Sequence, residues 1–411
     1  MKFSELDGKR VALWGLGRET SAFRAQLEQR LPAATISAVV DDATPEHETR
    51  TALARAEVLV RSPGVSIYKP LIQEAIANRT PVTTATGLWL AERGGRHVIG
   101  VTGTKGKSTT ATVIAHLLRQ VMPVELAGNI GRPVIELLDL AGAGSGNDIW
   151  VVCELSSYQI ADLAIGPEVA VLTNLSREHT DWHGSEQRYR ADKLRIFELP
   201  GVRAAVRPLG DRGGWPLVVA EEQIPLRGRH NAENVACALA AIEAAGLPLP
   251  ALPGALEGLT ALPHRLQTVH VDGRGIEWVD DSISTTPQSA IAALEAFGDR
   301  PAILIAGGSD RDQDYGALAA ALARRTADTT LIHVPDTGWL VAEAAEAFGF
   351  AGDRIARAED IPDAVRLARA LAPDGAVVLL SPAAPSFNRY ANFERRGDDF
   401  AACAKSLALR S

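Results

Sequence analysis

The sequence has few cysteines and no long apolar segment. Its 411 residues include three cysteines, Cys153, Cys237 and Cys403, which lie far apart along the chain. An odd number of separated cysteines supports neither a disulfide framework nor a zinc site. No stretch approaches the roughly 18 uninterrupted apolar residues of a membrane span, and the N-terminus carries charges before any apolar run. These absences predict a cytoplasmic protein with no membrane partner.

An excess of basic charge is also missing. The formal net charge is −8, with acidic and basic residues interspersed. This balance argues against a nucleic-acid groove and favours small anionic ligands held by local basic side chains. A hydrophobic content of 46% over 411 residues exceeds the needs of one ordinary core, so two or three domains are expected. We expect the chain to act as a monomer.

The most informative motif is a glycine-rich turn that follows the apolar segment 98–102. Gly103 and Gly106 allow backbone N–H groups to face an anion, and the helix that follows points its positive end at the same place. Lys107 adds a full charge, and Ser108 can ligate the Mg²⁺ that accompanies ATP. The spacing is a variant of the strict phosphate-loop pattern, which would have glycine at Val101. The motif predicts ATP or GTP binding, with an ordinary strand-to-helix turn as the alternative.

Strand and helix patterns divide the chain into three α/β domains, at residues 1–92, 93–268 and 269–411. In the first, strands at Arg10–Trp14 and Thr35–Val40 end in a Gly-Leu-Gly turn and in Asp41. This pattern is Rossmann-like, but Thr20 stands where the third glycine of a dinucleotide motif belongs. The site could therefore hold NAD or a nucleotide-sugar diphosphate, or be a plain tight turn. The segment 92–96 is a plausible linker to the next domain.

The second and third domains also alternate strands with helices. Expected strands lie at residues 149–153, 170–173, 204–206 and 217–220 in the second domain, and at 276–279, 302–305, 331–334 and 376–380 in the third. A helix is expected over 231–245. The sequence thus predicts an α/β protein with a Rossmann-like N-terminal domain, a central P-loop ATPase-like domain and a Rossmann-like C-terminal domain.

Polar residues follow several of these strands, where open α/β sheets bind ligands. Glu154 could supply a second Mg²⁺ contact or could cap a helix. His179 lies in a stretch with a further histidine and acids, which fits a metal or phosphate site or a polar surface loop. Asn231 and Asn234 share a helix face that could address an adenine edge, although helix capping by Asn231 is the alternative. Arg265 could clamp nucleotide phosphates.

Taken in order, these segments resemble the Mur ligases over nearly the whole chain, and most closely the glutamate-adding, MurD-type branch. The most specific segments are the phosphate loop, residues 128–131, 154–159, 174–184 with Lys193, 228–234, 263–265 and 381–397. The resemblance implies an ATP-dependent ligase of peptidoglycan precursor synthesis. Such an enzyme adds glutamate to UDP-N-acetylmuramoyl-L-alanine through an acyl phosphate and releases ADP and phosphate.

The resemblance also implies which residues contact each ligand. The uridine diphosphate substrate would contact Gly17, Arg18, Glu19, Thr20, Asp41 and Asn129. ATP would contact Gly103, Thr104, Lys105, Gly106, Lys107, Ser108, Thr109, Asn231, Asn234, Arg265 and Asp281. Glutamate would contact Thr285, Arg311, Ser386 and Phe393. Mg²⁺ would be held by Ser108, Glu154, His179 and Lys193, the last as a carbamate, and the catalytic groups would be Lys107, Lys193 and His179.

Two departures from the family pattern concern ATP and the amino acid. Lys105 stands where the family usually has asparagine, and Ile283 stands where D-glutamate-adding members usually have lysine. The sequence therefore leaves D-glutamate and L-glutamate both open, together with a different amino acid. Two further alternatives are a phosphate-loop binding module without ligase activity and a nicotinamide-dependent dehydrogenase.

Overall fold

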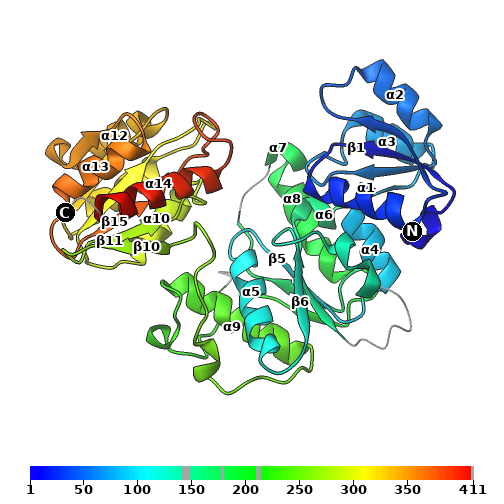
Figure 1. The fold of residues 1–411 in the computed structure, drawn as a ribbon, viewed down its shortest axis with the longest axis horizontal. Helices are drawn as coiled ribbons and strands as arrows, with labels where there is room; N and C mark the ends of the chain where they lie inside the picture. The colour runs from blue at the N-terminus through cyan, green and yellow to red at the C-terminus, as the bar shows by residue number, and fades with distance from the viewer. Residues whose placement is uncertain (141–148, 177–179, 210–213, 409–411) are drawn as a thin grey trace. The chain divides into compact units, whose positions relative to one another are not determined.

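Three β-sheets flanked by helices form the fold, which confirms the predicted α/β architecture (Figure 1). The computed structural model describes residues 1–140, 149–176, 180–209 and 214–408. Seven strands, all in the interior of a sheet, are buried along their whole length, because helices on both faces leave these strands no solvent-facing row of side chains. This burial explains why the strands read as continuous apolar runs.

The first sheet is parallel throughout, in the order β2-β1-β3-β4. Its strands are β1 (Arg10–Trp14), β2 (Thr35–Val40), β3 (Val58–Arg61) and β4 (Val82–Thr83). Its helices are η1 (Ser4–Leu6), α1 (Arg18–Arg30), α2 (Glu46–Arg55), α3 (Pro70–Ala77) and α4 (Ala85–Arg93). The Thr20 hydroxyl is buried and donates to the carbonyls of Gly15 (2.7 Å) and Gly17 (3.1 Å), so it ties the start of α1 to the end of β1.

The central sheet is also parallel, in the order β6-β7-β5-β8-β9. Its strands are β5 (Val98–Thr102), β6 (Val124–Gly128), β7 (Trp150–Glu154), β8 (Val169–Leu172) and β9 (Ala204–Val206). The helices that follow in sequence are α5 (Lys107–Arg119), η2 (Val134–Leu140), α6 (Ser157–Ile160), α7 (Thr180–His183), α8 (Glu186–Leu194), η3 (Arg195–Phe197), η4 (Glu221–Gln223), α9 (Arg229–Ala244) and η5 (Gly254–Leu256). Strand β5, which feeds the phosphate loop, is therefore the middle strand.

The third sheet has the order β10-β11-β15-β12-β13-β14, and β10 is antiparallel to β11. Its strands are β10 (Gln267–Val271), β11 (Glu277–Asp280), β12 (Ala302–Ala306), β13 (Thr329–His333), β14 (Ile355–Arg357) and β15 (Val377–Leu380). Its helices are α10 (Pro287–Glu295), α11 (Gly316–Arg324), α12 (Gly338–Ala347), η6 (Gly352–Arg354), α13 (Ile361–Leu371) and α14 (Phe393–Ala408).

One strand predicted from the sequence is wrong. Residues 217–220 form no strand, and Leu217 and Val218 remain exposed. Pro216 precedes them and has no N–H group to donate to a sheet ladder. Apolar composition alone therefore misled the prediction, since Val219 is the one buried residue of this segment.

The first two sheets belong to one compact unit, formed by residues 1–223 and 232–257. Residues 224–231 group instead with 258–411 in a second unit, which contains the third sheet. The exact domain boundaries at residues 92 and 268 stay a prediction. The segment 92–96 is packed and does not act as a free linker, because the Arg93 side chain is buried and donates to the carbonyls of Arg96 and Ile149.

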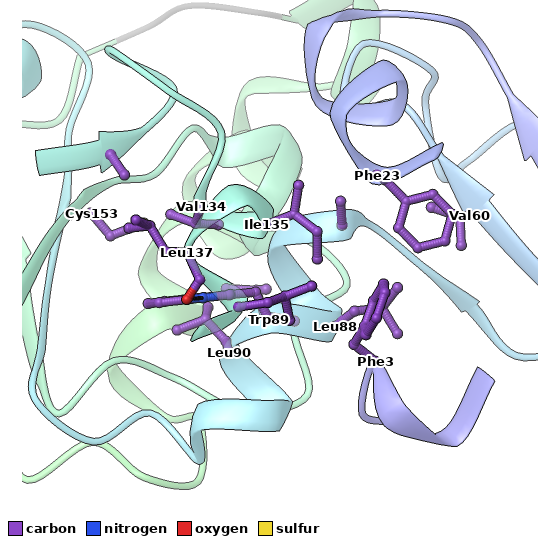
Figure 2. Close-up of a cluster of buried hydrophobic side chains, with 14 of the residues drawn as sticks. Phe3, Phe23, Val60, Leu88, Trp89, Leu90, Val134, Ile135, Leu137 and Cys153 are labelled. Atoms are coloured by element: carbon purple, nitrogen blue, oxygen red, sulfur yellow. Dashed lines mark hydrogen bonds between the residues drawn. The ribbon is translucent and has the colours of Figure 1, made fainter. Parts of the chain in front are cut away.

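A single hydrophobic cluster joins the first and central sheets (Figure 2). Helix α4 supplies Leu88, Trp89 and Leu90, which are fully buried. The Trp89 indole donates to the Leu137 carbonyl of η2 at 3.1 Å, so its polar edge is satisfied inside the core. The cluster extends from Phe3 in the first domain to Cys153 in β7.

A buried ion pair reinforces the same junction. The Arg61 side chain at the end of β3 is completely buried, and its Nε donates to Asp162 Oδ2 at 2.8 Å. The same guanidinium donates to the Val65 carbonyl at 2.9 Å and the Tyr158 carbonyl at 2.7 Å. Arg61 therefore fixes both the loop that follows β3 and the helix α6 region of the central domain.

No helix within the described ranges is long and apolar enough to cross a bilayer.

Replacing Arg61 tests this junction. We expect Arg61→Met to lower the free energy of unfolding of the first unit by about 3–5 kcal/mol, because it leaves the Asp162 charge buried without its partner. The matched control is Arg24→Met, which removes a half-exposed pair with Glu28 and should change stability by about 0.5 kcal/mol or less. Urea denaturation measures both. Equal effects of the two variants would contradict the assignment of Arg61 as a structural anchor.

Candidate active site

The predicted phosphate loop lies between β5 and α5, and its glycines are sterically required. Gly103 has a φ of +152°, and a Cβ there would lie 1.9 Å from the Thr173 hydroxyl oxygen. Gly106 has a φ of +78°, and a Cβ there would lie 2.2 Å from Asn234 Oδ1. The loop backbone thus passes so close to its neighbours that no side chain fits. The arrangement brings Asn234, a predicted nucleotide contact, to the start of α5.

Asn174, which follows β8, holds the loop in shape. Its side-chain oxygen accepts from the Lys105 N–H and its side-chain nitrogen donates to the Lys105 carbonyl, both at 2.9 Å. Its own carbonyl accepts from the Thr104 N–H at 3.0 Å. The Lys107 ammonium donates to the Thr104 carbonyl at 2.9 Å, so it lies over the turn. The amide of Asn174 pre-shapes the loop, a function that the sequence prediction did not assign to it.

Lys193 lies against this loop although 90 residues separate it from Gly103 in sequence. Its ammonium is buried and donates to the Gly103 carbonyl at 2.7 Å. It lies 5.0 Å from the centroid of the Tyr189 ring, and the Tyr189 hydroxyl is 2.8 Å from the Thr104 hydroxyl. Helix α8 thus supplies two side chains that contact the phosphate loop.

Glu154 ends β7, the strand beside β5. It is 1% exposed, and its Oε1 accepts from the Asn129 side chain at 3.0 Å. Its Oε2 has no hydrogen-bond partner among the described residues. A buried carboxylate oxygen without a partner is costly unless a cation satisfies it. Since Mg²⁺ prefers oxygen ligands, the unpartnered Glu154 oxygen fits such an ion.

Asn129 connects the two predicted substrate sites. Its N–H donates to the Glu154 carbonyl at 2.9 Å, and its own carbonyl accepts from Arg18 at 2.6 Å. Arg18 is the first residue of α1, directly after Gly17 at the end of the β1 turn. Hydrogen bonds therefore connect Arg18, a predicted uridine contact of the first domain, through Asn129 to Glu154, a predicted metal ligand of the central domain.

The Glu19 carboxylate accepts hydrogen bonds from other residues of the protein. It accepts from the Thr86 N–H (2.8 Å) and hydroxyl (2.9 Å) and from the Gln159 side chain (2.9 Å). Burial raises the pKa of Glu19 above its usual range, and these hydrogen bonds oppose that rise. Glu19 thereby joins α1, α4 and α6, and its role in contacting the uridine substrate stays a prediction.

A surface hollow of about 360 Å³ lies at the carboxyl ends of β1 and β2. Trp14, Asp41, Thr44 and Lys69 are among its lining residues. Hydrogen bonds from Thr44 and from the Ala43 N–H hold the pKa of Asp41 below its usual range, so this carboxylate is an acceptor at neutral pH. The hollow has the position that a doubly wound sheet uses for a nucleotide.

The predicted contacts of the third sheet also gather at strand ends. Asp281 follows β11 and accepts from the Leu266 N–H at 3.1 Å and the Ser381 hydroxyl at 2.7 Å. The Thr285 carbonyl accepts from Gln313 at 3.1 Å. Arg265 lies next to His264, whose Nδ1 is 2.7 Å from Asp280 Oδ2.

The remaining predicted amino-acid contacts differ in exposure. Ser386 is buried, and Arg311 is exposed with its guanidinium 5.8 Å from the Phe387 ring centroid. The Phe393 ring packs edge-on against His264 at 6.0 Å. The Asn231 side chain donates to the Arg227 carbonyl at 2.7 Å, within the second unit. His179 lies outside the described residues.

Arg396 is a further buried group that the sequence prediction did not select. It is 2% exposed, donates to the Ser282 hydroxyl and carbonyl at 2.9 Å, and donates to the Ala384 carbonyl at 3.1 Å. Burial lowers the pKa of Arg396 to about 10. The available signal was its position in the segment 381–397, which follows β15 and is rich in polar residues. Arg396 fixes the loops that follow β11 and β15.

Substituting Gly103 tests the loop geometry. We expect Gly103→Ala to weaken ATP binding roughly 5- to 150-fold, because the added Cβ imposes strain of about 1–3 kcal/mol. Gly254→Ala is the matched control, since a Cβ there meets nothing within 4 Å. Calorimetric titration with ATP measures both variants. Wild-type affinity in Gly103→Ala would rule out the close approach of Gly103 and Thr173.

The pKa of Asp281 predicts a pH-dependent stability. Burial raises this pKa to about 6 from an ordinary value of 3.8. As pH rises from about 4 to about 6, the unfolded chain releases this proton before the folded chain does, so Asp281 lowers the free energy of unfolding by up to roughly 3 kcal/mol.

We expect Asp281→Asn to remove this slope, so its stability relative to wild type should improve between pH 4 and pH 7. Amide hydrogen exchange of β11 and β15 is the measurement. A difference between variant and wild type that does not change with pH would show that the carboxyl titrates normally.

Comparisons with known proteins cover almost the entire chain. A family model described as the Mur ligase middle domain matches residues 101–212, and one described as the Mur ligase glutamate ligase domain matches residues 264–384. A UDP-N-acetylmuramoyl-L-alanine--L-glutamate ligase from Micromonospora sp. is 38% identical, covering 99% of this chain and 99% of that protein. The ligase of the same name from Xanthomonas euvesicatoria is 39% identical, covering 98% of this chain and 97% of its own length.

Solved structures show the same fold at low identity. The UDP-N-acetylmuramate-alanine ligase MurC of Thermotoga maritima aligns with a TM-score of 0.60 at 19% identity, covering 97% of this chain and 100% of that one. The MurF ligase of the same organism, solved with ADP, aligns with a TM-score of 0.57 at 17% identity, covering 98% and 97%. Given full-length relatives at 38–39% identity, this chain belongs to the Mur ligase family.

Proposed function

We propose that this protein is an ATP-dependent ligase that joins L-glutamate to UDP-N-acetylmuramoyl-L-alanine in peptidoglycan precursor synthesis. The observation that carries the proposal is the chain of contacts Arg18–Asn129–Glu154 beside the phosphate loop, inside one compact unit. This chain of contacts supports a uridine site in the first domain close to an ATP site in the central domain. The full-length relatives are named as L-glutamate ligases, which favours L-glutamate over the D enantiomer.

The chemistry needs two reactive groups brought together away from water. A carboxylate oxygen of the alanyl group attacks the γ-phosphorus of ATP, which forms an acyl phosphate and releases ADP. The glutamate amine then attacks the acyl carbon, and phosphate leaves after the tetrahedral intermediate collapses. Lys107 at the start of α5 would offset the negative charge of the transferred phosphoryl group. The buried surroundings of Glu154 and Lys193 limit access of water.

We assign Mg²⁺ and phosphate binding to the carboxyl edge of the central sheet. Ser108 and Glu154 would hold the ion that accompanies ATP, which neutralises charge on the phosphates. A carbamylated Lys193, with His179, would hold a second ion, because carbamylation converts the ammonium into an anion. The Lys193 nitrogen already lies 2.7 Å from the Gly103 carbonyl, at the base of the phosphate loop. The ATP phosphates would be surrounded by Gly103, Thr104, Lys105, Gly106 and Thr109, and Asn234 would contact the nucleotide.

The hollow near Asp41 would take the uridine, and Gly17, Arg18 and Thr20 shape the turn beside it. Arg265, Asp281 and Asn231 would complete the nucleotide contacts, while Thr285, Arg311, Ser386 and Phe393 would position glutamate. Since ATP is available in the cytoplasm, we place the reaction there and propose that a monomer catalyses it.

A paired assay tests the proposal. With ATP, Mg²⁺ and UDP-N-acetylmuramoyl-L-alanine, we expect phosphate release with L-glutamate to exceed release with D-glutamate about 100-fold in kcat/KM, because a site built around hydrogen bonds rejects a misplaced carboxylate. Mass spectrometry of the product identifies the amino acid added. Lys107→Ala is the negative control and should show almost no turnover. Preference for D-glutamate, or ATP binding without any ligation, would contradict the proposal.

A further inference from the structure

Tyr68 makes a second connection between the first domain and the phosphate loop. It lies in the loop 62–69, which follows β3 at the carboxyl edge of the first sheet. Its hydroxyl lies 2.7 and 2.8 Å from the two carboxylate oxygens of Asp192 on α8. Asp192 immediately precedes Lys193. A hydrogen bond to a carboxylate is among the stronger ones in proteins, so this contact constrains the helix.

Asp192 is also the centre of a buried polar network. His183 Nδ1 lies 2.6 Å from Asp192 Oδ2, and His183 Nε2 lies 3.0 Å from the Ser157 hydroxyl. His183 is fully buried, and Ser157 is 2% exposed. The order serine, histidine, aspartate is that of a nucleophilic triad, but a buried hydroxyl leaves no space for a substrate carbonyl. The network instead ties together α6, α7, α8 and the loop 62–69.

The same loop also holds α7 directly. The Ser66 hydroxyl donates to the Trp182 carbonyl at 2.7 Å, and the Trp182 indole N–H lies 3.1 Å from the carbonyls of Pro63 and Gly64. The Trp182 ring stacks on Tyr158 with centroids 4.6 Å apart. The charged groups around Tyr68 and Asp192 are Arg188, whose guanidinium lies 4.6 Å from the Tyr68 ring, and Arg195.

Helix α8 transmits this constraint to the phosphate loop. One residue after Asp192, Lys193 donates to the Gly103 carbonyl, and Tyr189 one turn earlier contacts Thr104. Rotation of α8 by a few tens of degrees would break either the Asp192 contact or the Lys193 contact, because side chains one residue apart point about 100° apart on a helix. The two sets of contacts therefore fix the same helix orientation.

We propose that Tyr68 and Asp192 form a positioning pair, through which the loop at the nucleotide-sugar end of the first domain sets the orientation of α8 and hence of Lys193. The inference rests on the proposed function, because it takes the first domain as the site of the uridine diphosphate substrate. Binding at that site adds contacts beside the loop 62–69, which Arg61 and Trp182 already hold, and the Tyr68–Asp192 hydrogen bond carries the added constraint to α8.

Hydrogen exchange tests the transmission without turnover. In the wild-type chain, UDP-N-acetylmuramoyl-L-alanine alone should protect amides of both the loop 62–69 and α8. In Tyr68→Phe the substrate should still protect the loop but should lose most of its effect on α8. Tyr390→Phe is the matched control, since it removes a tyrosine hydroxyl that donates to Asp399 in the other unit, and it should leave the protection of α8 unchanged.

Kinetics provides an independent readout. Loss of a contact that orients a catalytic side chain typically costs 10- to 100-fold. We expect Asp192→Ala to lower kcat by about that factor with KM for the UDP substrate within about threefold, and Asp192→Asn to recover part of the loss, since an amide oxygen still accepts from Tyr68. Adding Tyr68→Phe to Asp192→Ala should cause no further decrease, because the two residues act through one bond.

The outcomes separate this inference from the proposed function. If the wild-type loop 62–69 gains no protection from the substrate, the nucleotide-sugar assignment fails and the inference fails with it. If the loop is protected while α8 responds equally in wild type and Tyr68→Phe, only the inference fails. Additive losses in the double variant, or losses confined to thermal stability with unchanged kcat, would likewise overturn it.

Discussion

The shared hydrophobic core between the first and central sheets is the constraint on which the proposed active site depends. Trp89 and its neighbours on α4 are buried among residues of both sheets, and the Trp89 indole satisfies its one donor on Leu137. A junction of this kind behaves like the interior of a single domain, because its side chains interlock at crystal-like density. This core holds the two sheets at a fixed position relative to each other. That position allows short contacts between them, namely Arg18–Asn129, Glu19–Gln159 and Arg61–Asp162.

Parallel topology then decides where the chemistry gathers. The strands β5, β7 and β8 end at one edge, and each delivers a polar residue there: the phosphate loop, Glu154 and Asn174. The unpartnered Glu154 oxygen and the tightly held loop are both costly in an isolated fold. Such costs are typical of sites whose ligand supplies the missing partner. The third sheet repeats this pattern with Asp281 and Ser381 within its own unit.

Local sequence patterns were sufficient for most strands and for the phosphate loop, since both depend on neighbours in sequence. Glycine spacing predicted the turn at Gly103 and Gly106, and apolar runs located the buried strands. Long-range pairings were not accessible: nothing near Glu19 indicates that Thr86 and Gln159 bind it, and nothing near Asp192 indicates Tyr68. Asn174 could have been selected, because it follows a strand beside β5. The segment 217–220 misled the prediction, since Leu217, Val218 and Ala220 stay exposed.

Native-state hydrogen exchange of a Trp89→Leu variant tests the shared core most directly. We expect amides of β1 and β5 to lose opening free energy together, by about 2–4 kcal/mol for a truncated buried aromatic side chain, while amides of β12 are unchanged. Such a result would show that the first and central sheets open as one cooperative unit. Loss of protection in β1 alone, with β5 at its wild-type value, would contradict the account.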